Sequence, residues 1–252
     1  MKPGFANKGP TNPSKDWGSS AHWGYPVEKA GTRRKRLGLA LLLAGGLLLV
    51  VVTWLLVRFG GNNFHEIEPG TWYRSAQMSP EDLRETIKNH EIRTVLALRG
   101  HDPGDDEWYQ PEVDACEAEG ATHLVAKMAS SRLPWRSELQ RLFEALDAAE
   151  PPLLVHCYKG SDRTGLASVI WLHDFRGKPL KEARNQLNFT PYMHFRYGSA
   201  AEMHEFLDRF EAWRDSRPRG QYKIRDWVKL HYFEEKEGRE IGPWLDGVTY
   251  KP

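Results

Sequence analysis

The most apolar stretch of the chain lies near its N-terminus, from Leu37 to Val57, and reads LGLALLLAGGLLLVVVTWLLV. These 21 residues carry no charge, and Arg36 and Arg58 flank them. About 20 apolar residues cross a bilayer as a helix, and in lipid a helix satisfies its own backbone hydrogen bonds. The pattern therefore predicts a transmembrane helix over 37–57.

Two other interpretations of this stretch are open. A buried core helix usually keeps a polar stripe, which this stretch lacks. A cleaved signal peptide fits less well because the apolar run is long, 36 residues precede it and no clear Ala-x-Ala site follows. We interpret the stretch as a signal anchor.

The charges beside the predicted helix indicate its orientation. Five of the eight residues from 29 to 36 are Lys or Arg, whereas Arg58 is the only Lys or Arg in the first fifteen residues after the helix. The positive-inside rule then places the N-terminus in the cytoplasm and everything after residue 58 on the far side. Residues 1–36 lack apolar periodicity and are rich in Gly, Pro, Ser, Asn and Lys, so they are predicted to form a disordered cytoplasmic tail.

From residue 60 to 215, short apolar runs alternate with helical patterns. Buried strands are predicted at 92–98, 123–128 and 151–156, and helices after Ser79, at 111–119, at 139–149, at 164–175, near 179–187 and near 199–214. This alternation predicts an α/β domain with a mostly parallel central sheet flanked by helices on both faces, preceded by one transmembrane helix. The pattern does not place residues 216–252, which are treated as a C-terminal extension.

Two helix starts carry capping patterns. Ser79 is a good N-cap, and Pro80 suits the first helical position. Ser137 to Gln140 form a capping-box pattern ahead of the helix at 139–149. These patterns predict helices that begin just after Ser79 and Ser137.

The composition fits one globular domain with additions better than two full domains, given 252 residues. Hydrophobic residues make up 40% and charged residues 27%, which excludes disordered, collagen-like and multi-spanning membrane proteins. Two cysteines cannot form a disulfide scaffold or a four-cysteine zinc site. The net charge of +1 gives no signal for a nucleic-acid partner. Residues 1–36 hold eight Lys/Arg and two Asp/Glu, whereas the rest holds 27 and 32, so the two parts are expected to face different surroundings.

The residues with the clearest chemistry lie at 155–165, where a predicted strand ends and a predicted helix begins. Backbone amides that converge before a helix N-terminus bind anions, and this position is the usual ligand site of an open α/β sheet. Gly160 and Gly165 permit close backbone approach. Arg163 offers a planar fork of donors that matches two phosphate oxygens. Cys157, facing this positive field, is expected to be a thiolate near neutral pH and hence a nucleophile.

The HCYKGSDRTG run at 156–165 resembles the His-Cys-x5-Arg-Thr/Ser signature of the cysteine-dependent protein tyrosine and dual-specificity phosphatases. Its Gly-x-Asp-Arg-Thr-Gly ending is similar to the bacterial, atypical dual-specificity branch. The YRSAQ run at 73–77 resembles the opening motif of that branch, and 98–100 resembles its Leu-Arg turn. The resemblance covers roughly 65–213. It implies the phosphatase fold and a bacterial source. Together with the predicted span and its flanking charges, this gives an expected location in the bacterial inner membrane with a periplasmic catalytic domain.

The resemblance also implies roles for the residues of the loop. Cys157 attacks phosphorus and forms a phosphocysteine, while Arg163 and the loop amides hold the equatorial oxygens. Thr164 is expected to hydrogen-bond the sulfur as it leaves, and His156 to order the loop. The remaining loop residues are expected to bind substrate: Tyr158, Lys159, Gly160 and Ser161. No metal or organic cofactor is implied.

The general acid departs from the pattern of the family. Many members carry an aspartate shortly after the strand predicted at 123–128, but residues 128–134 hold no carboxylate. Asp162, within the loop itself, is the favoured substitute, and a salt bridge that only orients Arg163 is its alternative role. The acidic loop after 92–98 offers three more candidates, unless it is only a solvated turn: Asp102, Asp105 and Asp106. An enzyme without a dedicated acid is the remaining interpretation.

Other residues have mostly structural interpretations. Cys116 is expected to be a small helix residue, with a reversible disulfide to Cys157 as the alternative. Arg74 is expected to form a structural ion pair more readily than to approach substrate. Lys159 is expected either to add positive charge to the site or to be solvated.

His173, His194 and His204 are interpreted as ordinary surface or interface histidines. The aromatic residues at 222–244 are expected to pack on the domain, with contact to lipid headgroups as the alternative.

Three functions compete. The leading one is a membrane-anchored phosphatase that hydrolyses phosphomonoesters of a protein, a lipid or glycolipid, or an inositol. An inactive pseudophosphatase that binds phosphorylated ligands is the second, and the intact Cys157, Arg163 and Thr164 argue against it. A rhodanese-like sulfurtransferase is the third, and the Arg-Thr pair at the end of a seven-residue loop argues against that. The expected partners are a phosphorylated substrate and, through residues 37–57, a membrane.

Overall fold

A computed structural model describes residues 30–59, 61–100, 107–198 and 200–235. The chain divides into two compact units, residues 1–53 and 54–252. Helix α1 (Ala30–Phe59) contains the predicted span. Its segment Lys35–Thr53 is long and apolar enough to cross a membrane, and none of it is buried, unlike a core helix. Signal sequences share this composition, so α1 is a candidate membrane span by length and composition alone.

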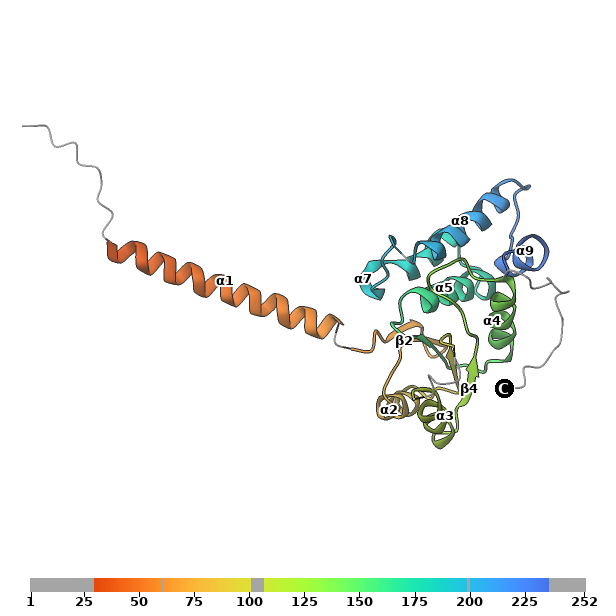
Figure 1. Cartoon of the computed structure of the whole chain (residues 1–252), viewed down its shortest axis with the longest axis horizontal. Coiled ribbons are helices and arrows are strands. Elements are labelled where there is room, and N and C mark those ends of the chain that lie inside the picture. Colours follow the sequence, from red (N-terminus) through yellow and green to blue (C-terminus); the bar gives the residue numbers. More distant parts are fainter. Residues whose placement is uncertain (1–29, 60, 101–106, 199, 236–252) are drawn as a thin grey trace, which may run out of the picture. The chain divides into compact units, whose positions relative to one another are not determined.

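The second unit is built on a five-stranded sheet with the order β1-β2-β5-β3-β4 (Figure 1). Its strands are β1 (His65–Glu68), β2 (Trp72–Ala76), β3 (Thr94–Ala97), β4 (Thr122–Val125) and β5 (Leu153–Cys157). β2, β5, β3 and β4 run parallel, and β1 pairs antiparallel with β2. The predicted mostly parallel sheet is therefore confirmed.

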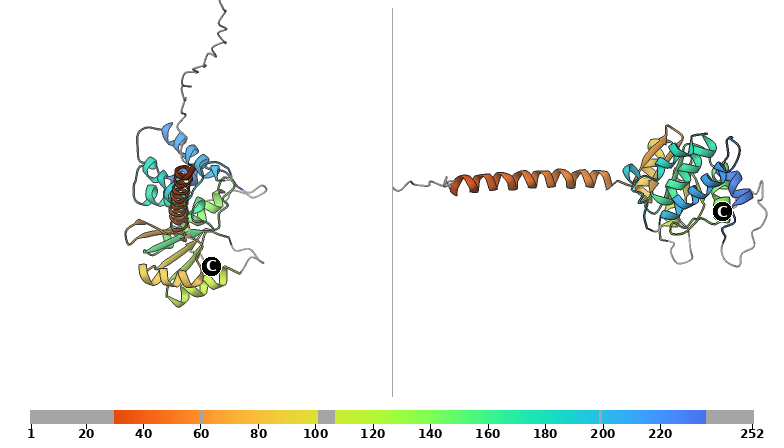
Figure 2. Two further views of the ribbon diagram at one scale, coloured as in Figure 1. Left: turned by 90° about the vertical axis from the view of Figure 1, so that its left-hand side faces the viewer. Right: turned by 90° about the horizontal axis from the view of Figure 1, so that it is seen from above.

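Helices cover both faces of the sheet (Figures 1 and 2). Two helices pack on one face, α2 (Pro80–His90) and α3 (Tyr109–Ala118). Four pack on the other: α4 (Arg136–Ala148), α5 (Asp162–Ile170), α8 (Ala201–Asp215) and α9 (Ile224–His231). Strand β5 is buried along its whole length, because it lies between these layers and between two other strands.

Short helical segments connect α5 to α8. A π-helix, Trp171–Phe175, continues α5. It is followed by α6 (Leu180–Ala183), a 3-10 helix (Arg184–Leu187) and α7 (Phe189–Tyr192). These segments replace the single predicted helix near 179–187, and they bring residues 184–198 close to the carboxyl end of β5, as the contacts below show.

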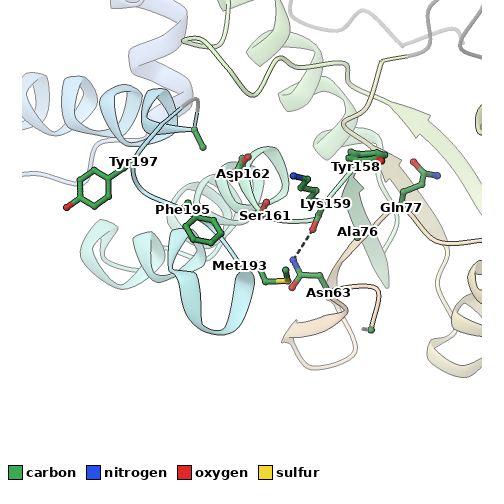
Figure 3. Close-up of a pocket in the computed structure, with 12 residues that line it drawn as sticks. Asn63, Ala76, Gln77, Tyr158, Lys159, Ser161, Asp162, Met193, Phe195 and Tyr197 are labelled. Atoms are coloured by element: carbon green, nitrogen blue, oxygen red, sulfur yellow. Dashed lines mark hydrogen bonds between the residues drawn. The ribbon is translucent and has the colours of Figure 1, made fainter. Parts of the chain in front are cut away.

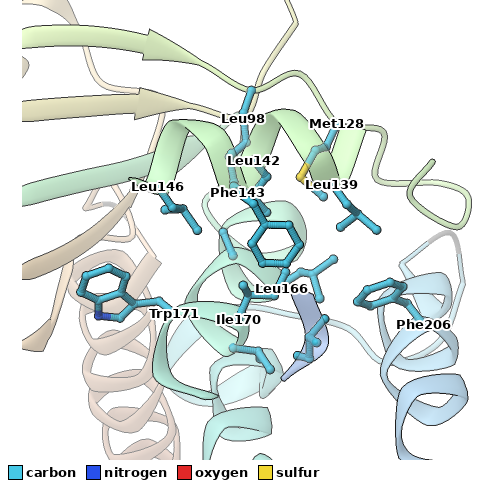
Figure 4. Close-up of a cluster of buried hydrophobic side chains, with 14 of the residues drawn as sticks. Leu98, Met128, Leu139, Leu142, Phe143, Leu146, Leu166, Ile170, Trp171 and Phe206 are labelled. Carbon is cyan, nitrogen blue, oxygen red and sulfur yellow. The ribbon is translucent and has the colours of Figure 1, made fainter. Parts of the chain in front are cut away.

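The larger hydrophobic core lies between the sheet and the helices α4, α5, α8 and α9 (Figure 4). Leu98 and Met128 from the sheet edge meet Phe143 of α4, and Leu166 of α5 and Phe206 of α8 complete the contact. The apolar positions of α4 recur at helical spacing, which is why one face of that helix is buried. This core fixes the start of α5 relative to the end of β5.

The capping predictions had different outcomes. Ser79 caps α2 as predicted, since its side chain accepts a hydrogen bond from the amide of Asp82 at 3.1 Å, and Pro80 is the first helical residue. The capping box from Ser137 is wrong, because α4 already begins at Arg136. There the Glu138 carboxylate accepts from the Trp135 amide, while Ser137 donates to Glu235. The side chain of Ser137, which the local pattern assigned to the cap, therefore binds a residue far away in the sequence instead.

Part of the predicted C-terminal extension belongs to the core. Trp227 and Val228 of α9 pack in the larger cluster, and Tyr232 after it donates a hydrogen bond to the Pro134 carbonyl at 2.6 Å. Asp174 accepts hydrogen bonds from the amides of Ile224 and Arg225 at 2.8 Å and so caps α9. The expected packing of aromatic residues on the domain is confirmed for Trp227 and Tyr232.

Candidate active site

The candidate site lies at the carboxyl edge of the sheet, in the segment between β5 and α5. We call residues 157–163 the anion loop. Because β5 lies between β2 and β3, this loop starts in the middle of the sheet edge. Within the described residues, no side chain caps the N-terminus of α5 at Ser161, so the first amides of the helix remain available to an anion.

Arg163 is held by the ends of two neighbouring strands. Its Nη1 donates to the carbonyls of Leu98 and Met128, each at 3.2 Å. Its Nε is buried and has no hydrogen-bond partner among the residues that the structure describes. The guanidinium is thus fixed in place while part of its donor fork remains unused, as an anion-binding arginine requires.

Arg74 of β2 holds the anion loop by hydrogen bonds to its backbone. It is fully buried in β2 and donates from Nη2 to the carbonyls of Gly160 at 2.7 Å and Ser161 at 3.2 Å. Its Nη1 donates to the backbone and side-chain oxygens of Gln186. Burial lowers the pKa of Arg74 to about 10, although the nearby Tyr192, Cys157 and Asp162 oppose that shift. Arg74 therefore has a structural role, as the sequence favoured, but it acts through hydrogen bonds to neutral oxygens and not through the expected ion pair.

Two glycines are required by the packing of the loop. Gly160 has a φ of +68°, and a Cβ there would lie 2.5 Å from the backbone of Ser75 and Ala76. A Cβ at Gly165 would lie 2.6 Å from Leu187. The loop therefore sits on β2 and on the 184–187 segment with no space for a side chain at either position.

His156 is fixed by a carboxylate that the sequence did not single out. The Oε1 of Glu112, on α3, lies 2.9 Å from His156 Nε2 and 2.8 Å from His123 Nε2, and Gln77 also donates to this carboxylate. Burial alone would raise the pKa of Glu112, but the two histidines outweigh it and lower this pKa to about 2. The expected role of His156 in ordering the loop agrees with this anchored position.

Cys157 ends β5 and is 2% exposed. Thr164 is buried, and its Oγ1 makes no hydrogen bond within the described residues. The bond from Thr164 to the Cys157 sulfur is therefore not formed in this structure. It was expected for the sulfur as a leaving group and stays a prediction for that step.

A cavity of about 690 Å³ lies beside the anion loop (Figure 3). Tyr158, Lys159, Ser161 and Asp162 line it, whereas Gly160 is buried against β2. Figure 3 shows Phe195 and Tyr197 on one side of the cavity and Tyr158 and Gln77 on the other. Asn63 joins the loop to α7, because its Nδ2 donates to the carbonyls of Lys159 at 3.0 Å and Tyr192 at 3.1 Å.

Asp162, the favoured general acid, lines this cavity and has a side chain that is 25% exposed. Its Oδ1 lies 2.8 Å from Nδ1 of His194, whose side chain is fully buried. His194 Nε2 in turn lies 3.0 Å from Nε2 of His204. His194 was interpreted as an ordinary surface or interface histidine, but its side chain is buried beside Asp162, because the chain folds back over the loop after α7. No motif in the sequence marked this residue.

The segment at 128–134, where many family members carry the general acid, supplies no carboxylate to the cavity. Its Arg132 pairs with Glu138 of α4 at 2.7 Å, and that carboxylate is buried away from the cavity. Asp102, Asp105 and Asp106 lie outside the described residues. Among the described residues, Asp162 is the carboxylate that lines the cavity beside the anion loop.

The two cysteines are free and lie in different cores. Cys157 belongs to the larger cluster, whereas Cys116 packs on the other face of the sheet with Tyr73, Leu83 and Leu154. Burial raises the pKa of the Cys116 thiol to about 12. Cys116 therefore has the expected structural place, and the alternative disulfide is not formed in this structure.

The comparisons with known proteins point to one family. Residues 59–175 match a family model described as the tyrosine phosphatase family. This match confirms the resemblance to the cysteine-dependent phosphatases and the predicted class of enzyme, a phosphoric monoester hydrolase. No curated protein matches the chain.

The solved structures that the chain resembles are distant in sequence. TpbA of P. aeruginosa is 21% identical, over 57% of this chain and 84% of that chain, with a TM-score of 0.44. The active form of Tk-PTP is 23% identical, over 60% of this chain and 97% of that chain, with a TM-score of 0.46. The core catalytic domain of SIW14 from S. cerevisiae is 18% identical, over 62% of this chain and 94% of that chain, with a TM-score of 0.45.

Proposed function

We propose that this chain, whose residues 59–175 match the tyrosine phosphatase family, is a membrane-anchored phosphatase that hydrolyses phosphomonoesters through a phosphocysteine. One observation carries the proposal. Cys157 and Arg163 lie at the two ends of one loop between β5 and α5, and Arg163 is held by the carbonyls of Leu98 and Met128 with its Nε unused. A nucleophile and a fixed fork of donors then share one anion site.

The reaction proceeds in two displacements. In the first, the Cys157 thiolate attacks phosphorus, an S–P bond forms, and the bond from phosphorus to the ester oxygen breaks as Asp162 gives that oxygen a proton. In the second, water attacks phosphorus, gives a proton to the Asp162 carboxylate and releases phosphate as the S–P bond breaks. Arg163 and the amides at the start of α5 stabilise the equatorial oxygens in both steps.

The cavity beside the loop is where the alcohol part of the substrate is expected to bind. It combines the cationic Lys159 with exposed aromatic rings, Phe195 at 63% and Tyr197 at 87% exposure. A site of this kind suits a phosphoprotein, a phosphorylated lipid or glycolipid, or an inositol phosphate, which are the classes expected from the sequence. The membrane anchor favours an envelope or lipid-linked phosphate among them.

The experiment that tests the function is a release assay for inorganic phosphate with the full chain in detergent micelles. The substrates are a phosphotyrosine peptide, a phosphoinositide and an inositol phosphate, and rapid acid quench captures the phosphocysteine. We expect turnover of at least one class of substrate. We also expect the quenched protein to carry a phosphoryl group, and this group to be absent when Cys157 is replaced. Phosphate binding without turnover would instead indicate a pseudophosphatase, and transfer of sulfur from thiosulfate to cyanide would indicate a sulfurtransferase.

Membrane anchoring through 37–57 with an outside catalytic domain is the second part of the proposal. The apolar segment within α1 and the basic cluster before it support this orientation. In a bacterial host, we expect alkaline phosphatase fused at the C-terminus to be active and a reporter that fluoresces only in the cytoplasm to be dark. The opposite pair of results would place the domain in the cytoplasm and weaken the preference for an envelope substrate.

We expect Asp162→Asn to slow hydrolysis of esters with poor leaving groups by about 10²-fold or more, because their leaving oxygen needs a proton. Asparagine keeps an oxygen for the hydrogen bond from His194 but has no acidic proton to give to the leaving oxygen. Activated aryl phosphates, whose leaving group needs little protonation, are expected to lose much less. The measurement is kcat/KM against the leaving-group pKa for both enzymes.

The matched control for that substitution is Asp114→Asn on α3, which removes an exposed carboxylate far from the cavity. It is expected to leave both classes of substrate unchanged. Equal losses for both classes in Asp162→Asn would point to a structural role of Asp162. In that case Asp102, Asp105 and Asp106 are replaced one at a time and the comparison is repeated.

A further inference from the structure

A chain of three side chains leads from the cavity to α8. Asp162 lines the cavity, His194 lies buried behind it, and His204 of α8 is half-buried behind His194. The separations are 2.8 Å from Asp162 Oδ1 to His194 Nδ1 and 3.0 Å from His194 Nε2 to His204 Nε2. Both lie within hydrogen-bond distance, so each contact contains a proton.

The two contacts fix one another's direction, because a neutral imidazole has one donor and one acceptor nitrogen. When Asp162 is a carboxylate, His194 donates from Nδ1, so its Nε2 accepts a hydrogen bond from His204. When Asp162 carries a proton, it donates to His194 Nδ1, so His194 Nε2 donates to His204. The protonation of Asp162 is thus tied to the tautomers of both histidines.

The surroundings of His204 suit it to this exchange. Burial, the adjacent His194, and the positive charges of Arg196 and Arg184 lower the pKa of His204 to about 4, while Asp208 opposes them. His204 is therefore neutral near pH 7 and is able both to donate and to accept. At the other end of the chain, Asp162 lies near the buried guanidinium of Arg74, whose pKa its charge raises.

We propose that His194 and His204 form a proton relay that loads Asp162 for leaving-group protonation, with His194 also positioning its carboxyl group. A proton from solvent enters at His204 Nδ1, the Nε2 proton of His204 moves to His194 Nε2, and the Nδ1 proton of His194 moves to Asp162. One proton enters and one arrives, so the charge balances. When phosphate leaves, the same transfers run in reverse. This inference rests on the proposed function.

Two substitutions separate relay from support. In His204→Gln, the amide keeps a hydrogen bond to His194 Nε2 but cannot pass a proton on. In His194→Asn, the side-chain amide stands where Nδ1 stood, so it still donates to Asp162 while the path to His204 is cut. Both variants are designed to keep the carboxyl group in place.

We expect each variant to lower kcat for esters with poor leaving groups by about 10-fold or more, with KM nearly unchanged. Activated aryl phosphates are expected to change by less than about twofold, because they do not need the proton. In the Asp162→Asn background neither substitution is expected to have a further effect, since residues that act through one group are not additive. The matched control, His231→Asn on α9, is expected to leave all rates unchanged.

The outcomes also separate this inference from the proposed function. In one outcome, Asp162→Asn slows esters with poor leaving groups more than activated aryl phosphates while His204→Gln and His194→Asn slow neither class. That outcome overturns the relay and leaves the phosphatase mechanism standing. Equal losses on both substrate classes would assign the two histidines to folding alone. If Cys157→Ser retains normal turnover, the proposed function fails and the relay fails with it.

Discussion

Replacing Cys157 with serine is expected to lower kcat by about 10⁴-fold or more while inorganic phosphate still binds. The hydroxyl is a far weaker nucleophile than a thiolate, and loss of a covalent nucleophile has effects of this size. The anion site remains because Arg163 is held by carbonyls of other strands, and the loop by Arg74, independently of the sulfur. Steady-state kinetics and calorimetry with phosphate make the two measurements.

Cys116→Ala is the control for this substitution, because Cys116 is also buried and lies on the opposite face of the sheet. It is expected to retain the rate constants of the unchanged enzyme, with some loss of stability. Near-normal turnover of Cys157→Ser would end the cysteine mechanism. Loss of phosphate binding in that variant, together with a lowered melting temperature, would mean that the loop itself had collapsed.

The second large effect is expected for Arg163→Lys, with kcat/KM lower by about 10²- to 10³-fold, the range for loss of one preorganised donor at a developing charge. Lysine keeps the positive charge but presents a single point donor in place of the planar fork. It also cannot make the same pair of hydrogen bonds to the carbonyls of Leu98 and Met128 while binding an oxyanion. Initial rates with one activated and one unactivated phosphate ester give the measurement.

Arg84→Lys, on the exposed face of α2, is the control for the change of residue type and is expected to be silent. A transition-state role predicts that Arg163→Lys reduces kcat more than it weakens phosphate binding. Retained catalytic efficiency in Arg163→Lys would count against the assigned role. An equal loss for binding and for kcat would reduce Arg163 to a general anion anchor.

Features that depend on neighbouring residues were predictable from the sequence. The apolar length of 37–57, the cap at Ser79 and the change from strand to helix around 157–163 each depend on residues within one or two turns. Periodicity and capping act at that range, so the order of elements and the parallel sheet followed from them. The anion loop itself was found because its nucleophile, glycine and arginine lie within seven residues.

The contacts that support that loop could not be predicted, because each supporting residue reaches it from a distant part of the chain. Arg74 lies 86 residues before Gly160, Glu112 44 residues before His156, and His194 32 residues after Asp162. Which of the ten histidines meets Asp162 depends on how the chain folds back after α7, and no local rule contains that information. The same reason explains the wrong cap at Ser137, whose side chain found a partner 98 residues away.

The sequence by itself thus determined the candidate reacting groups, Cys157 and Arg163, and the kind of fold that presents them. The tertiary structure alone decided what surrounds them: the arginine beneath the loop, the carboxylate behind His156 and the histidine pair behind Asp162. The physical reason is one of range. Side-chain periodicity and backbone capping act over a few residues, whereas hydrogen bonds between buried polar groups form only after strand order and helix packing have brought their partners within about 3 Å.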